Sequence, residues 1–386
     1  MSRDAVIFAG YFVRCPLGGY GWQMLHYLCG FRDLGYDVYF YEDTRHHWQA
    51  YDPLTRTTGS DYANGVALAR ELFAGAGFGE RWVFHDAAAG TYAGLDRNAT
   101  RALFADARIL VNAAGVNRFT AEERAGKANV YIDMDPAYTQ LRLAGEDRLL
   151  QEIVGEHQVH FTFGENIGTP RCPIPTGAVR WRPTRQPIAV DLWPVEPVAP
   201  DAPFTTIGTW DSSGRDVVLN GERYSWRKKL EWAKVMSLPR DTNAPFVLAM
   251  EVRDDADRAL LEGSGWTVRD PIPVSRDTQS YQRFIVESRA EFTTAKDVNV
   301  RLCSGWFSDR SASYLAAGRP VITQDTGFAE VLPTGEGLFS FRTLEDACAA
   351  VAAITAEPER QGAAARRIAE EHFAAPKVVG DLLAHL

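Results

Sequence analysis

The sequence predicts an α/β protein of two halves, each built around a parallel sheet. Three observations support this. The first fifty residues follow a strand–loop–helix–strand order, short apolar strands recur along the rest of the chain, and a proline-dense stretch separates two such halves. Strands that alternate with helices and are buried on both faces are typical of parallel sheets. A chain of 386 residues also suggests two domains of ordinary size.

The N-terminal half opens with a βαβ unit. Residues 6–9 form an apolar run that we interpret as a strand, and residues 38–40 resume as a second strand. Between them, residues 21–35 carry apolar side chains at helical spacing and end on Gly35, where a helix C-cap glycine belongs. Further strands are expected at residues 107–115, 129–135 and 159–168.

Residues 171–203 are expected to link the two halves. Prolines recur throughout this stretch, and a segment so rich in proline forms neither a continuous helix nor a central strand. We therefore divide the chain into an N-terminal domain of residues 1–170 and a C-terminal domain of residues 204–386, whose last helix can pack back on the first domain. Strands of the second domain are expected at residues 204–210, 246–250, 290–295 and 320–324.

Composition narrows the class of protein. The net charge of -9 disfavours a general binder of nucleic acid or anionic membranes, which is normally basic. Five cysteines are dispersed without a C-x-x-C pair, which is typical of reduced thiols in a cytosolic protein. No run of about 18 apolar residues is present, and the N-terminus lacks the pattern of a signal peptide. We expect a soluble, cytoplasmic protein.

A glycine loop, "CPLGGYGWQ", precedes the first helix. Its Gly18, Gly19 and Gly21 let a ligand approach the backbone, and the helix N-terminus favours an anion. The dinucleotide fingerprint G-x-G-x-x-G is not met, because the loop is too long and Met24 stands at the third glycine position. The loop is either a phosphate-binding element or a flexible turn without a ligand.

Two carboxylates follow a predicted strand in "IDMDP". Asp133 and Asp135 could together hold Mg²⁺ or Mn²⁺, but Asp135 is also placed to cap a helix that begins at Pro136, and we favour the cap. Either carboxylate could face a cleft, because ligands of open parallel sheets bind beyond the carboxyl ends of strands. With His46, these aspartates are the candidates for a general base. No histidine has the spacing of a zinc site.

Cationic and hydroxyl side chains gather around strand ends in the second half. In an acidic protein such a set favours a diphosphate ligand. An arginine guanidinium can donate two hydrogen bonds to it, and lysine ammonium groups and backbone N–H groups can add further contacts. Lys228 could instead lie on a solvent-exposed face of a helix and bind no ligand. Tryptophans beside these loops could stack on a base or a sugar, although tryptophan is more often core. The candidates are Thr209 and Trp210 in "GTWDSSGRD" with its two serines, then Lys228, Lys296, Arg301 and Arg310.

Both ends of the chain resemble one family. "SDRSASYLAAGRPVITQDTGFAEVLPTGEGLFSFRTLEDACAAV" resembles the donor-binding region of GT-B glycosyltransferases, from a small-residue helix through A-x-G-x-P-V to the glycine-bearing loop and "GEGLFSF". "GGYGWQMLHYLCGFRDLGYDVYFYE" resembles the opening of the same enzymes. The C-terminal pattern is similar to the glycosyltransferase family 4-like and CgeB-like branch.

The resemblance implies GT-B architecture: two Rossmann-like domains that face a central cleft, with a nucleotide sugar held mainly by the C-terminal half. It also implies that no metal or other cofactor is bound. Arg310 and Ser311, with the N–H groups at their helix start, would bind the diphosphate. The glycine loop would lie near the donor phosphate and the acceptor. The residues bordering the sugar would be Asp325, Thr326 and Gly327.

The sequence departs from the family at two positions. Retaining members usually carry glutamates in E-x₇-E spacing, the second of them five residues before the glycine of A-x-G. Here Gly305 and Ser313 stand at these positions. Because the second glutamate usually binds the ribose hydroxyls, Ser313 leaves the nucleotide open.

The sequence thus predicts a cytoplasmic, metal-independent glycosyltransferase that moves a sugar from a nucleotide-diphosphate donor to a small-molecule or glycan acceptor. The helix dipole and the cations would stabilise the leaving diphosphate. An inverting enzyme needs a side-chain base, whereas in a retaining one the diphosphate can take the proton. Two alternatives are a sugar-nucleotide epimerase on the same fold and a non-catalytic binding protein, the latter favoured by the missing glutamates. The oligomeric state stays open.

Overall fold

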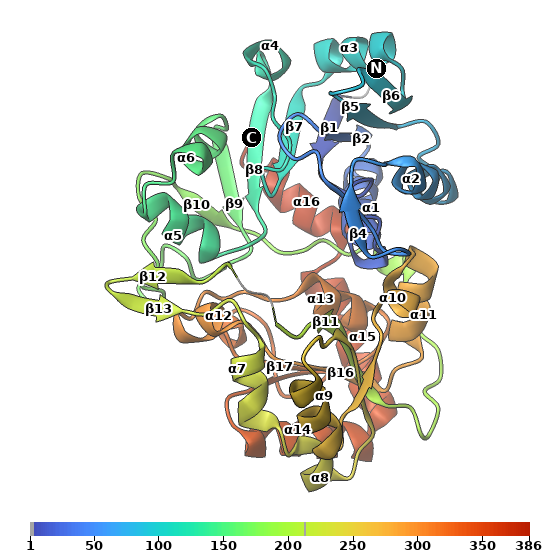
Figure 1. The fold of residues 1–386 in the computed structure, drawn as a ribbon, viewed down its shortest axis with the longest axis vertical. Helices are drawn as coiled ribbons and strands as arrows, with labels where there is room; N and C mark the ends of the chain where they lie inside the picture. The colour runs from blue at the N-terminus through green and yellow to red at the C-terminus, as the bar shows by residue number, and fades with distance from the viewer. Residues whose placement is uncertain (1–3, 212–213) are drawn as a thin grey trace.

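Each half of the chain forms its own sheet in the computed structural model, which describes residues 4–211 and 214–386. The two sheets lie one above the other along the long axis of the molecule (Figure 1). Helices flank both sheets, and most strands run parallel to their neighbours. The predicted α/β class with two parallel sheets is confirmed.

Within the described residues the N-terminal sheet has eight strands, and only its edge strand β6 runs antiparallel to its neighbour. Its strands, in spatial order, are β10 (Trp181–Pro183), β9 (Val159–Thr162), β8 (Ala128–Asp133), β7 (Ile109–Ala113), β1 (Ala5–Ala9), β2 (Asp37–Asp43), β5 (Trp82–Asp86) and β6 (Thr91–Gly94). A separate hairpin is formed by β3 (Ala50–Asp52) and β4 (Thr57–Gly59). Since β10 pairs with β9, the N-terminal sheet extends into the stretch predicted to be a linker.

The helices of this domain cover both faces of its sheet. They are α1 (Gly18–Asp33), α2 (Ala63–Gly75), α3 (Arg97–Asp106), α4 (Ala121–Arg124), α5 (Tyr138–Ala144) and α6 (Arg148–Gly155). As expected from the spacing of its apolar residues, α1 buries Met24, Leu28 and Phe31 completely.

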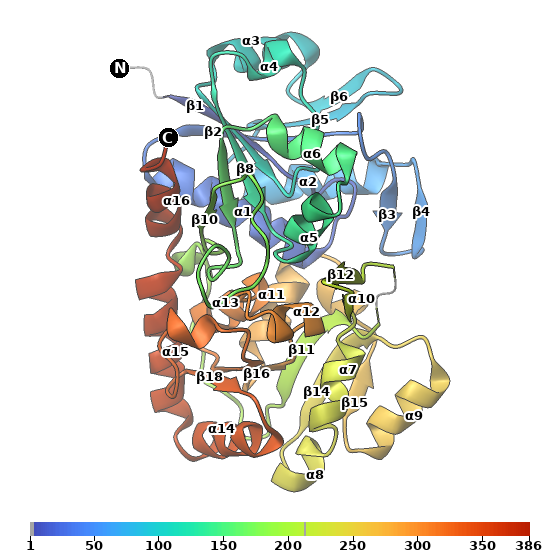
Figure 2. The same cartoon turned by 90° about the vertical axis from the view of Figure 1, so that its left-hand side faces the viewer.

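The described C-terminal sheet has six strands, all parallel. Their spatial order is β15 (Thr267–Arg269), β14 (Phe246–Glu251), β11 (Phe204–Thr209), β16 (Ala290–Thr293), β17 (Val321–Gln324) and β18 (Leu338–Phe341). A hairpin of β12 (Val217–Leu219) and β13 (Glu222–Tyr224) projects from it toward α5 (Figure 2). The helices are α7 (Lys229–Trp232), α8 (Leu238–Thr242), α9 (Asp255–Gly263), α10 (Ile272–Ser275), α11 (Thr278–Val286), α12 (Asp297–Arg301), α13 (Asp309–Ala316), α14 (Leu344–Ala356) and α15 (Pro358–His372).

The last helix, α16 (Ala375–Leu383), returns to the N-terminal domain and packs on α1 (Figure 1). The chain therefore crosses between the domains twice, and the two crossings run side by side. The N–H of Ile188 donates to the carbonyl of Phe373 at 2.7 Å, and the N–H of Ala375 donates to the carbonyl of Ile188 at 2.8 Å. No helix in the described part of the chain is both long and apolar enough to cross a membrane.

Candidate functional site

A cleft of about 800 Å³ lies between the two domains, at the carboxyl ends of β7, β8 and β11. Ligands of open parallel sheets bind at this edge, so the cleft is the candidate site. Seven of the residues singled out in the sequence line it: His46, Asp133, Asp135, Thr209, Lys228, Lys296 and Arg310.

Arg310 stands in the first turn of α13, as expected, but its guanidinium already has partners. Its Nε donates to Oε1 of Glu291 at 2.5 Å, its Nη1 to the carbonyl of Ile207 at 2.6 Å and its Nη2 to Oγ1 of Thr293 at 3.0 Å. The arginine thus ties the ends of β11 and β16 to α13. It supplies positive charge to the cleft from a fixed position.

Lys228 is the cation with the least compensation. No carboxylate among the described residues lies within ion-pair distance of its ammonium group, which is half-buried in the cleft wall. Burial, and then repulsion from Arg310 and Lys296, lower the pKa of Lys228 well below its usual value, while Glu291 and Asp309 act less strongly in the opposite direction. A positive charge held this way is stabilised when an anion binds beside it.

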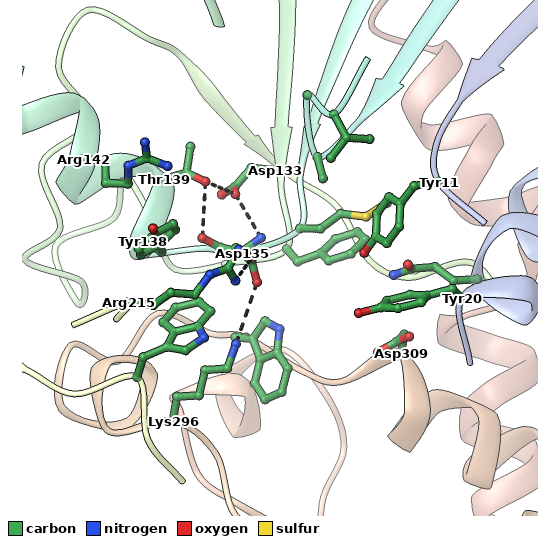
Figure 3. A pocket seen from close by; sticks show the side chains of 18 of the residues that line it. Tyr11, Tyr20, Asp133, Asp135, Tyr138, Thr139, Arg142, Arg215, Lys296 and Asp309 are labelled. Carbon is green, nitrogen blue, oxygen red and sulfur yellow. Dashed lines mark hydrogen bonds and ion pairs between the residues drawn. The ribbon is translucent and has the colours of Figure 1, made fainter. Parts of the chain in front are cut away.

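Lys296 bridges the two walls of the cleft. Its ammonium lies 3.3 Å from the centre of the Trp226 ring and 3.8 Å from Oδ1 of Asp135 (Figure 3). Arg215 donates from Nη1 to Oδ2 of the same aspartate at 3.1 Å, and its guanidinium lies over the Tyr138 ring. Burial lowers the pKa of Lys296 to about 8 even though Asp135 opposes the shift.

The two aspartates of "IDMDP" have different roles. Asp133 is fully buried, and both of its oxygens are occupied: Oδ1 accepts from Thr139 Oγ1 at 2.7 Å and from the N–H of Asp135 at 3.1 Å. Oδ2 accepts from Gln140 Nε2 and from Thr162 Oγ1, both at 2.7 Å. Burial nevertheless raises the pKa of Asp133 to about 6. Asp133 therefore anchors α5 to the sheet, and the neighbouring Asp135 is the carboxylate that faces the cleft.

The predicted helix cap is wrong. The helix α5 begins at Tyr138, its N-cap residue is Ala137, and the carboxylate of Asp135 bonds to Arg215 instead of to backbone N–H groups. The carboxylate of Asp135 pairs with cations of the opposite domain instead of capping the helix. The sequence pattern does not show that these cations lie nearby. Among the described residues, no group of three or more histidines, cysteines, aspartates or glutamates is arranged to hold a metal ion.

Replacing Asp133 by asparagine is expected to destabilise the protein by about 2 kcal/mol, because the amide N–H₂ would face hydrogen-bond donors in a buried site. Denaturant unfolding measures this loss. The matched control is Asp135→Asn, whose side chain is 38% exposed and whose ion pairs contribute about 0–1 kcal/mol. A larger loss for Asp135→Asn than for Asp133→Asn would contradict these roles.

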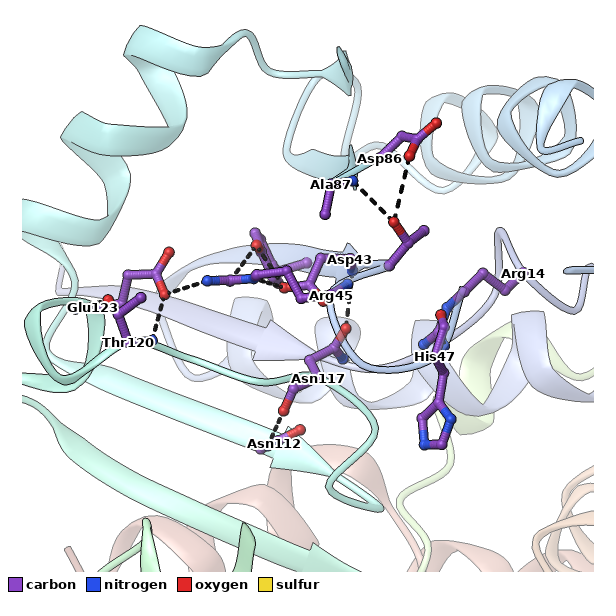
Figure 4. Close-up of polar contacts among 12 residues, drawn as sticks. Arg14, Asp43, Arg45, His47, Asp86, Ala87, Asn112, Asn117, Thr120 and Glu123 are labelled. Atoms are coloured by element: carbon purple, nitrogen blue, oxygen red, sulfur yellow. Dashed lines mark hydrogen bonds and ion pairs between the residues drawn. The ribbon is translucent and has the colours of Figure 1, made fainter. Parts of the chain in front are cut away.

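His46 reaches the cleft from the loop after β2, and a partly buried network of hydrogen bonds holds this loop (Figure 4). Arg45 donates to Asp43 Oδ2 at 2.6 Å and to Glu123 Oε2 at 2.8 Å, and Arg14 donates to the carbonyl of His47 at 2.7 Å. Burial, then nearby arginines, lower the pKa of His46 below its ordinary value. The lowered pKa favours the neutral imidazole, which is the form that can accept a proton.

The prediction of a glycine loop before the first helix is wrong, because α1 begins at Gly18 and the three glycines belong to its first turns. They pack between the domains and do not line the described cleft, although Tyr20 beside them does. A Cβ on Gly18 would lie 2.2 Å from the carbonyl oxygen of Asp277, and one on Gly21 would lie 2.7 Å from Cγ2 of Thr278. Gly19 leaves 3.3 Å to the nearest atom of Tyr281. These glycines let α1 approach α11 of the C-terminal domain.

Other predicted donor-binding residues lie away from the described cleft lining. Trp210 is core and donates from Nε1 to Asp257 at 2.9 Å, and Arg301 pairs with Glu222 on the β12–β13 hairpin. Ser311 is fully buried, and Ser313 donates to the carbonyl of Asp309 at 3.1 Å. The serines of "GTWDSSGRD", Ser212 and Ser213, lie outside the described residues.

The loop after β17 belongs to the domain contact. Asp325 accepts from Arg342 at 2.7 Å and from the N–H of Gly327 at 2.8 Å. Thr326 donates to the carbonyl of Trp306 at 2.5 Å, and Asn166 of the N-terminal domain donates to the carbonyl of Gly327 at 3.1 Å. The three residues expected to border the sugar are engaged in these contacts.

Several lining residues were missed. Tyr11 and Tyr20 project from the N-terminal domain above Asp309, the first residue of α13 (Figure 3). Burial raises the pKa of Asp309, and no pattern marked it beyond its place at a helix start. Tyr11, two residues after the end of β1, could have been found as a residue near a strand end. Arg142, Arg215 and Trp226 were also missed, and they line the cleft from segments that are distant in sequence.

No protein-family model matches the chain, and no curated protein matches its sequence. Solved structures match its fold over nearly the full length. An alpha-glucosyltransferase in complex with UDP-glucose and DNA containing an abasic site is 11% identical, with a TM-score of 0.59 over 100% of this chain and 99% of that one. AviGT4, a glycosyltransferase of avilamycin A biosynthesis, is 12% identical, with a TM-score of 0.53 over 99% and 96%. Anabaena Alr3699/HepE in complex with UDP is 10% identical, with a TM-score of 0.54 over 100% of both chains. The chain therefore has the GT-B fold.

Proposed function

We propose that the chain is a cytoplasmic, metal-independent glycosyltransferase of the family 4-like and CgeB-like kind. It binds a nucleotide-diphosphate sugar against the C-terminal wall of the cleft and transfers the sugar to an acceptor on the N-terminal wall. Support comes from the fold, shared with glycosyltransferases whose structures contain UDP or UDP-glucose, and from the charge of the cleft.

The uncompensated ammonium of Lys228 carries the proposal. Placing a third cation beside Arg310 and Lys296 costs free energy in an empty, partly desolvated cleft. A diphosphate offsets this cost, since it supplies two negative charges to the same wall. The N-terminus of α13 adds its partial positive charge. The lysines and the helix terminus can then neutralise the leaving diphosphate without a bound metal.

Proton transfer from the acceptor has two candidate groups in the N-terminal wall. Asp135 and the neutral His46 both line the cleft, whereas the oxygens of Asp133 are occupied. The diphosphate itself is a third possible base. Asp135 already accepts a hydrogen bond from Arg215 at 3.1 Å, which fixes its carboxylate at the cleft.

Calorimetric titration with UDP, GDP, TDP and CDP sugars tests the proposal. Binding of at least one of them is expected, and UDP-glucose is the first choice because related folds were solved with it. If none binds, the proposal is wrong. Consumption of the donor only in the presence of an acceptor extract supports transfer, consumption without one supports an epimerase, and binding without consumption supports a non-catalytic protein.

The affinity for UDP-glucose is expected to fall as the pH rises from 7 to 9. Lys296, with its pKa lowered to about 8, is mostly an ammonium at the lower pH and mostly neutral at the higher one. The diphosphate favours the ammonium, so binding weakens by up to roughly tenfold, and binding at pH 8 takes up protons. Calorimetry in two buffers of different ionisation enthalpy measures both effects. An affinity independent of pH would contradict the role of Lys296.

A further inference from the structure

The two walls of the cleft differ in chemistry. The C-terminal wall is formed mostly by polar and charged side chains, among them Arg215, Lys228, Lys296 and Arg310. The N-terminal wall contains an apolar corner, which comprises Ala114, Gly115, Val116, Leu149, Leu150 and Ile153. Its residues come from the loop after β7 and from α6, two segments that meet beside β8.

Close packing builds this corner. A Cβ on Gly115 would lie 2.7 Å from Cε2 of Tyr131 and 2.8 Å from Cγ2 of Ile153, so the loop lies directly against β8 and α6. Ala114 and Gly115 both have positive φ, 57° and 64°. A non-glycine residue in this region is strained, and such strain is retained where the surrounding structure fixes a particular shape. The turn presents Val116 to the cleft.

The corner offers little to a polar ligand. Its five side chains carry no hydrogen-bonding atom, and burial of sugar hydroxyls against them would leave those hydroxyls unpaired at a cost in free energy. Arg142 is the cation of the described N-terminal wall, and it is already paired with Asp147. A phosphate backbone would therefore find no set of free cations on this wall.

We propose that the acceptor is a small molecule with an apolar, ring-bearing body and a hydroxyl group, and that its body lies in the apolar corner. This inference rests on the proposed function. The tyrosines of the cleft, Tyr11, Tyr20 and Tyr138, suit a flat ring, because aromatic faces pack on one another. Burial of an apolar body in a partly preformed corner supplies the affinity, and a few polar groups set its orientation.

The transfer step places the acceptor hydroxyl between the walls. Its oxygen bonds to the anomeric carbon of the donor sugar, and the bond from that carbon to the diphosphate oxygen breaks, with the electron pair leaving on the diphosphate. The hydroxyl proton passes to Asp135, to His46 or to the diphosphate. The products are a glycoside and a nucleoside diphosphate.

The test uses 4-methylumbelliferone, a flat apolar phenol, as the probe. Its binding to the full chain saturated with UDP is followed by fluorescence, beside the titration of UDP-glucose. Leu149 has 44% of its surface exposed, so Leu149→Gln alters the corner with little effect on folding. We expect roughly tenfold weaker probe binding and unchanged affinity for UDP-glucose. Val116→Asn, in the half-buried loop, is the second variant and is expected to act in the same direction.

The control is Leu260→Gln, a matched substitution on α9 at 53% exposure and outside the described cleft lining, which is expected to leave probe binding unchanged. Methyl glucoside and a short DNA duplex are titrated in parallel. The inference is overturned if UDP-glucose binds but the probe does not, if neither corner variant weakens the probe, or if the glucoside or the duplex binds in its place. If no nucleotide sugar of the calorimetric series binds, the proposed function is also overturned, so the two failures are distinguishable.

Discussion

Replacing Lys228 by methionine is expected to weaken the binding of UDP-glucose by roughly a hundredfold. Methionine keeps an unbranched, apolar stem and removes the ammonium group, with both its charge and its N–H donors. A hydrogen bond to a charged group in a desolvated site contributes about 1.5–3 kcal/mol. No carboxylate of the described residues forms an ion pair with Lys228, so its ammonium group is available to the diphosphate. Calorimetry measures the loss.

The same substitution is expected to leave the empty protein as stable as before or to raise its melting temperature. The ammonium of Lys228 is disfavoured by burial and by Arg310 and Lys296, so its removal relieves repulsion. A loss of affinity together with a gain in stability is the signature of a binding residue, because a structural lysine would lose both. Thermal unfolding without ligand provides the second measurement.

Lys229 is the matched control for this experiment. It follows Lys228 directly, is 41% exposed, and pairs with Asp257 at 2.7 Å. Lys229→Met is therefore expected to change stability by less than about 1 kcal/mol and nucleotide affinity not at all. Equal losses of affinity in both variants would show that general charge, and not the placement of Lys228, governs binding.

The second large effect is expected from Gly18→Ala. The new methyl group would lie 2.2 Å from the carbonyl oxygen of Asp277 and 2.7 Å from Cβ of Tyr281, and neither atom belongs to a flexible chain end. The helices α1 and α11 must then separate, which costs about 3 kcal/mol as other forms of overpacking do. Thermal unfolding and small-angle scattering would record a lower melting temperature and an altered domain arrangement.

Gly19→Ala separates this explanation from a phosphate-binding loop. The nearest atom to its Cβ is 3.3 Å away and belongs to the ring of Tyr281, which can move slightly. We expect little change in stability or in nucleotide affinity. A loss of nucleotide affinity in Gly19→Ala with unaltered stability would instead indicate that the loop contacts the donor phosphate.

The fold could be predicted from the sequence because the patterns that indicate its strands and helices are local. The βαβ order of residues 6–40 and the apolar strands ending at Ala113, Asp133 and Gln324 are short-range patterns, and the structure contains all of them. The antiparallel edge strand β6 and the short β10 were missed, because edge strands bury few side chains and show weak periodicity.

Site residues were predictable only where they follow a strand or open a helix. Lys228, Asp135 and Arg310 satisfy this condition and do line the cleft. The partners of Asp135 and Arg310 come from other segments of the chain. Glu291 occupies a neighbouring strand, and Arg215 meets Asp135 across 80 residues of chain. Whether a cation is free or already paired depends on such long-range contacts, and no local pattern encodes them.

The paired crossings at Ile188 and Ala374 define how this molecule can move. The two chain crossings are hydrogen-bonded to each other and together form one hinge. The domains can swing about this hinge, but a slide or a large twist would break the backbone hydrogen bonds between the crossings. Gln186, two residues before Ile188, lines the cleft, so a swing at the hinge would change the width of the cleft. A cut between the sheets, near residue 203, would leave α16 in the C-terminal fragment although it packs on α1 of the N-terminal domain.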